Sequence, residues 1–88
     1  MSTEKENAKQ EFLKSNSFMK LGQAIEHGNW KVAAMTVQRM QKTVQELEMD
    51  TFARQLNNIR QCIIHRQGKQ AKDILALMVA NRAKMLNQ

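Results

Sequence analysis

One stretch near the middle of the chain constrains the fold more than any other. Its apolar residues alternate spacings of three and four over about five helical turns: Trp30, Ala33, Val37, Met40, Val44 and Leu47. This period predicts a helix that buries one face against other helices. The chain has no Pro or Tyr and only three Gly, so it lacks the turn chemistry of a multi-stranded sheet.

Two shorter helices are predicted before this stretch. The first begins at Thr3-x-x-Glu6, where a hydroxyl and a carboxylate can cap each other's backbone amides, and it continues to Leu13. Residues 15–17, Ser-Asn-Ser, interrupt it because their side chains compete for backbone hydrogen bonds. A second helix follows and is expected to end at Gly28.

The boundaries of the later helices follow from polar residues between apolar runs. Asn29 can cap the central helix, Asp50 can cap the next, and the last runs from about Lys69. Met19, Met35 and Met49 are expected to lie off the inward stripes, and Cys62 is expected to be buried. The residues expected to hold the core are Phe12, Phe18, Trp30, Met40, Leu47, Phe52, Ile59 and Ile74.

The fold expected from these elements is an all-α, antiparallel up-and-down bundle of three long helices with an N-terminal helical cap in two pieces. Because 88 residues bury only one core, residues 1–88 form a single domain. The run Leu21-x-x-Ala24-Ile25-x-His27 has the spacing of Ile59-x-x-Cys62-Ile63-x-His65. This internal echo predicts two similar helical hairpins and is too short for a solenoid.

The sequence also bears on the compartment. A lone cysteine cannot form an internal disulfide, and this fits a reducing environment. No apolar run is long enough for a membrane span, and the first residues lack the layout of a signal peptide. We therefore expect a cytoplasmic protein.

Few residues in the chain could carry chemistry. The two His, one Cys and eight carboxylates form no constellation typical of a catalytic or metal site, and the glycines form no phosphate loop. We therefore expect neither catalytic activity nor a metal or other cofactor. His27 and His65 follow helix ends, where an imidazole can bind terminal carbonyls; the alternative is a phosphocarrier role for either.

The charge leaves two classes of partner open. The net charge of +6 could serve nucleic-acid binding, although the Lys and Arg residues form no run of three and lack interleaved aromatics. The outward face of the central helix combines a methionine with amides and positive charge, a composition that suits either protein docking or a solvated surface. Its residues are Lys31, Met35, Gln38, Gln41, Lys42 and Gln45.

The stretch from about Leu21 to Leu86 resembles a histidine-containing phosphotransfer domain, the four-helix carrier of two-component phosphorelays. Residues 24–30, Ala-Ile-Glu-His-Gly-Asn-Trp, resemble the entry to its active helix. Residues 38–42, Gln-Arg-Met-Gln-Lys, fall where the family carries H-x-L-K-G. Later apolar positions of the family match Leu47, Phe52 and Leu56.

The departures from that motif decide what the resemblance implies. Gln38 replaces the phosphorylatable His, Gln41 the assisting Lys and Lys42 the small Gly. A glutamine amide lacks the nucleophilic ring nitrogen of a phosphoryl carrier. The resemblance therefore implies a degenerate adaptor that docks a receiver domain or histidine kinase through Met35, Gln38, Arg39, Gln41, Lys42 and Gln45. A homodimer is compatible with every feature above.

Overall fold

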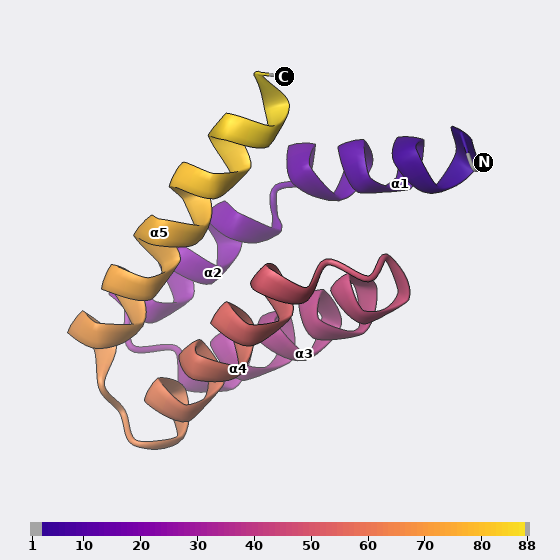
Figure 1. Cartoon of the computed structure of the whole chain (residues 1–88). Helices are drawn as coiled ribbons and strands as arrows, with labels where there is room; N and C mark the ends of the chain where they lie inside the picture. Colours follow the sequence, from indigo (N-terminus) through magenta and orange to yellow (C-terminus); the bar gives the residue numbers. More distant parts are fainter. Residues whose placement is uncertain (1–2, 88) are drawn as a thin grey trace.

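A computed structural model describes residues 3–87, and every regular element in that range is an α-helix (Figure 1). The all-α prediction is confirmed. None of the helices in residues 3–87 combines the length and hydropathy needed to cross a bilayer. The helices are α1 (Thr3–Lys14), α2 (Ser17–Glu26), α3 (Trp30–Glu46), α4 (Asp50–Ile64) and α5 (Gly68–Leu86).

Four of these helices form a closed ring. Each of α2, α3 and α4 packs against the helix that follows it, and α5 returns to pack against α2. The predicted bundle is therefore present, and α2, expected as part of the cap, forms its fourth side. In this ring α3 and α5 lie diagonally opposite each other and are not packed as neighbours.

The interior is filled by the apolar stripes that the spacing predicts. The stripe of α3 is buried at Ala33, Val37, Met40 and Val44, and the Cys62 thiol lies in the core as expected. Of the eight predicted core residues, all are buried except Trp30 and Ile74, whose side chains pack partly buried against the core.

The helix α1 closes one end of the ring (Figure 1). The Phe12 ring lies 5.4 Å from that of Phe18 and 6.2 Å from that of Phe52, so the cap joins α2 and α4 through one aromatic cluster. The Arg82 guanidinium donates to the Leu13 carbonyl and lies 5.3 Å from the Phe18 ring centre. These contacts also tie α1 to α5.

The three turns between α2 and α5 share one geometry. In each, a residue with positive φ follows the helix end: Gly28 at 68°, Glu48 at 56° and Arg66 at 58°. The next amide donates to the carbonyl five residues earlier, as from Asn29 to the Ala24 carbonyl at 2.8 Å, and the same bond recurs in the other two turns. This pattern is a Schellman motif, which satisfies the last carbonyls of the preceding helix.

Two local predictions are wrong and one is confirmed. The Asn29 side chain accepts from the Val32 amide at 3.3 Å, as expected of a cap. Met49, not Asp50, precedes the first turn of α4, and Asp50 is that helix's first residue. Met49 is also buried, because it follows the positive-φ residue of its Schellman turn, a position at which an apolar side chain commonly packs against the last turn of the helix.

The internal echo extends over both hairpins. Seven buried residues of α2 and α3 each have a buried counterpart on α4 or α5, 38 positions later. The hairpin α2–α3 is thus repeated as α4–α5. The set Phe18, Leu21, Ala24, Ile25, Ala33, Val37 and Met40 corresponds to Leu56, Ile59, Cys62, Ile63, Ala71, Leu75 and Met78.

Two isoleucines of α4 allow a matched test of this core. Ile59 has no exposed surface, whereas Ile64 is 55% exposed. We expect Ile59→Ala to lower the free energy of unfolding by about 2–5 kcal/mol, because it leaves a cavity. Ile64→Ala should change it by less than about 0.5 kcal/mol. Urea denaturation followed by circular dichroism measures both, and equal losses would contradict the assigned burial.

Candidate functional site

The predicted docking residues lie together on α3. Gln38, Arg39, Gln41, Lys42 and Gln45 line one shallow depression on its outward side. Met35 is 47% exposed and lies one turn earlier on the same face. These six residues are called the α3 face below. The residues predicted from the sequence therefore form one continuous, accessible surface.

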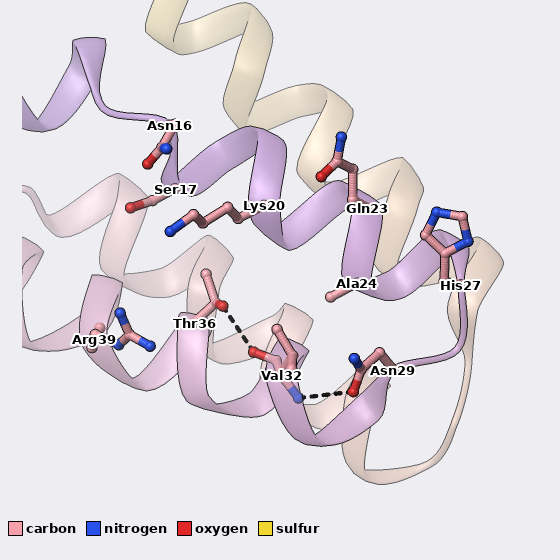
Figure 2. Close-up of a pocket in the computed structure, with 10 residues that line it drawn as sticks. All are labelled: Asn16, Ser17, Lys20, Gln23, Ala24, His27, Asn29, Val32, Thr36 and Arg39. Atoms are coloured by element: carbon pink, nitrogen blue, oxygen red, sulfur yellow. Dashed lines mark hydrogen bonds between the residues drawn. The ribbon is translucent and has the colours of Figure 1, made fainter.

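A larger depression runs along the seam between α2 and α3 (Figure 2). We call it the α2–α3 groove; its volume is about 480 Å³. Arg39 borders both this groove and the depression of the α3 face, so the two are adjacent. The groove is lined by Asn16, Ser17, Lys20, Gln23, Ala24, His27, Asn29, Val32, Thr36 and Arg39.

The polar groups of the groove are distributed unevenly along it. Figure 2 shows Lys20 extending between Ser17 on α2 and Thr36 on α3, with Arg39 at the same end. His27 lies at the opposite end, beside the turn into α3. The Thr36 hydroxyl is engaged, because it donates to the Val32 carbonyl at 2.8 Å.

Among residues 3–87, no carboxylate lines either depression. The acidic residue of α2 is Glu26, and its carboxylate accepts a hydrogen bond from the Lys72 ammonium of α5. That hydrogen bond, and then the charge of Lys72, hold the pKa of Glu26 below its ordinary value. Glu26 therefore stays ionised but is held toward α5, and the surface of α2 and α3 keeps an excess of positive charge.

Sequence reasoning missed the α2 side of this surface. The groove exists only because α2 packs beside α3, and helix periodicity does not show which exposed residues meet across a seam. One signal was present: α2 has no acidic residue in its first turn but carries Lys20 there, where the helix dipole disfavours a cation.

The two histidines are the C-cap residues of their helices. His27 follows α2 and His65 follows α4, and both side chains are exposed. Within residues 3–87, no three His, Cys, Asp or Glu side chains are grouped so that they could hold a metal ion. Arg66, next to His65, lies 5.6 Å from the Trp30 ring centre and so covers that indole.

No protein-family model, curated protein or solved structure matches this chain. A functional assignment therefore depends on the geometry of the α3 face and the α2–α3 groove.

The Glu26–Lys72 pair predicts a pH dependence of stability. Because folding lowers the pKa of Glu26, the pair's contribution is present above the unfolded pKa and is lost as pH falls through the folded pKa. We expect Glu26→Gln to lower the urea midpoint near neutral pH and to match the wild type in acid. Glu46→Gln, which removes an exposed carboxylate of α3, is the control. A difference that persists in acid would contradict the ion-pair explanation.

Proposed function

We propose that this protein is a non-catalytic docking module that binds an acidic protein surface through the α3 face and the α2–α3 groove. One observation carries the proposal: five of the six residues predicted as one face of α3 line a single depression, which adjoins the α2–α3 groove at Arg39, and none of the carboxylates in residues 3–87 lines either. An excess of positive charge attracts an acidic partner and speeds its encounter.

The chemistry of the surface suits a protein partner. Lys20, Arg39 and Lys42 supply charge-assisted hydrogen bonds to carboxylates, and the glutamines can donate and accept. Exposed Met35 and Val32 add apolar area between the polar groups. An apolar element surrounded by polar groups is typical of a protein interface, since methionine adapts its shape to the surface it meets.

The resemblance to phosphotransfer domains suggests which partner this is. Gln38 takes the position of the phosphorylatable His and is exposed at the edge of the depression. Receiver domains present a cluster of carboxylates at their phosphorylation site, and that cluster complements Arg39 and Lys42. In this proposal the chain occupies the docking surface of a receiver or kinase and accepts no phosphoryl group, because Gln38 has no nucleophilic nitrogen.

Nucleic-acid binding is the competing function, and the charge of α4 and α5 favours it. From residue 51 onward the sole acidic residue is Asp73, against seven basic ones. Phosphate binding by such a dispersed surface would depend on total charge rather than on one face. The two functions can therefore be distinguished by whether binding is weakened only by a charge reversal on the α3 face or equally by one elsewhere on the surface.

Charge reversal on the α3 face tests docking. We expect Arg39→Glu/Lys42→Glu to weaken binding to a receiver domain by at least about tenfold, because both cations lie at the docking surface. Arg54→Glu/Arg60→Glu changes the net charge equally on the exposed side of α4 and should weaken binding by less than about threefold. Purified receiver domains from the source organism, titrated by calorimetry at two salt concentrations, provide the measurement.

Two outcomes would overturn this proposal. If neither the wild type nor any variant binds a receiver domain, the proposed partner class is wrong. If both double variants weaken binding equally, or both weaken capture of duplex DNA or RNA equally while receivers do not bind, total charge and not the α3 face is responsible.

Restoring the missing chemistry tests the resemblance separately. We expect Gln38→His/Gln41→Lys to accept a phosphoryl group from a phosphorylated receiver: the aspartyl P–O bond breaks, a P–N bond forms at the new imidazole, and the aspartate is freed. The phosphoryl group bound to the new imidazole should be acid-labile. Asn58→His, on the exposed side of α4, should remain unlabelled.

Labelling of the wild type would contradict a non-carrier role. It would assign the phosphoryl group to His27 or His65, and His27→Ala and His65→Ala would show which. Absence of label on Gln38→His/Gln41→Lys, in a variant with the wild-type circular dichroism spectrum, would instead show that the α3 face does not meet a receiver's phosphorylation site.

A further inference from the structure

The outward side of α5 is apolar although no helix covers it. Leu77 is 63% exposed and Val79 38%, and Ala76, Ala80 and Ala83 are also exposed. The inward side of the same helix is buried at Ala71, Leu75 and Met78. A helix that is apolar on both sides is normally covered on both.

The internal repeat supplies a reference for this surface. Five of the six residues of the α3 face have apolar counterparts on α5, 38 residues later: Gln38 to Ala76, Arg39 to Leu77, Gln41 to Val79, Lys42 to Ala80 and Gln45 to Ala83; the sixth, Met35, corresponds to Asp73. On α3 the first five positions carry amides and cations, as a surface in contact with water does. On α5 every one of them is apolar. The difference belongs to the surface and not to the fold, which both hairpins share.

Charged groups limit the apolar surface at both ends. Asp73 and Lys84 lie on the outward side of α5, and neither forms an ion pair within residues 3–87. Arg82, the one charged residue between them, is turned inward, where it donates to Leu13 and covers Phe18. The surface therefore carries opposite charges about 16 Å apart along the helix axis, with apolar residues between.

We propose that this surface binds a second copy of the chain, with the two α5 helices antiparallel about a twofold axis. Asp73 of each copy then lies opposite Lys84 of the other, because the same patch serves both partners. In this register Leu77 lies opposite Ala80, so a large side chain meets a small one twice. The spacings 73, 76/77, 80 and 83/84 are those of a helix–helix seam.

Sedimentation equilibrium tests the proposal. The wild-type mass should rise with concentration toward twice the 10.2 kDa of one chain. Leu77→Glu should weaken self-association by more than about tenfold, because it places a charge in the apolar seam. Ile64→Glu, at an exposed apolar residue of α4, should leave it unchanged. Circular dichroism checks that each variant is folded.

Charge exchange tests the register itself. Asp73→Lys and Lys84→Asp should each weaken the dimer, since each places like charges opposite one another, and the double variant should restore wild-type affinity. A wild type that stays monomeric throughout, or weakening by Ile64→Glu as large as by Leu77→Glu, would overturn the proposal. Singles without effect, or a double variant no better than the singles, would overturn the antiparallel register.

Discussion

The three turns between α2 and α5 are the constraint on which the rest of the structure depends. Each reverses the chain within three residues through the same pair of backbone hydrogen bonds. Turns of this length force successive helices to be antiparallel neighbours. After three such turns, α5 packs against α2 and closes the ring. Gly22 lies at that last seam, where a Cβ would be in van der Waals contact with a Leu75 methyl at 3.4 Å.

Sequence reasoning reached the helices and most of the core because both depend on local spacing. The α3 stripe and the cap at Asn29 are set by residues within a few positions of each other. The turns at Glu48 and Arg66 gave weaker signals, because neither positive-φ residue is a glycine, and the burial of Met49 followed from the unrecognised turn. The α3 face could be predicted as one side of one helix. The α2–α3 groove could not, because Lys20 and Thr36 are brought together only by packing.

Charge is also arranged by this topology. Six of the eight acidic residues lie on α1 or around the α3–α4 turn, at the end of the bundle that α1 closes: Glu4, Glu6, Glu11, Glu46, Glu48 and Asp50. Lys5 of α1 pairs with Glu48 of the turn at 3.1 Å. The acids are thereby kept apart from the α2–α3 groove, and the positive groups there act without local neutralisation. The net charge of the chain alone does not describe this separation.

The diagonal placement of α3 and α5 determines how the two proposed surfaces would act together. Because they lie on opposite sides of the ring, contact through α5 leaves the α3 face of each copy pointing away from the twofold axis. Such a pair would be bivalent. Its two binding surfaces would face in different directions, so that one small domain could not contact both. It would join two separate partner molecules, or gain avidity on an array in which the partner is already clustered. With both proposed surfaces in use, this small bundle would act as a connector whose valency is set by its own concentration.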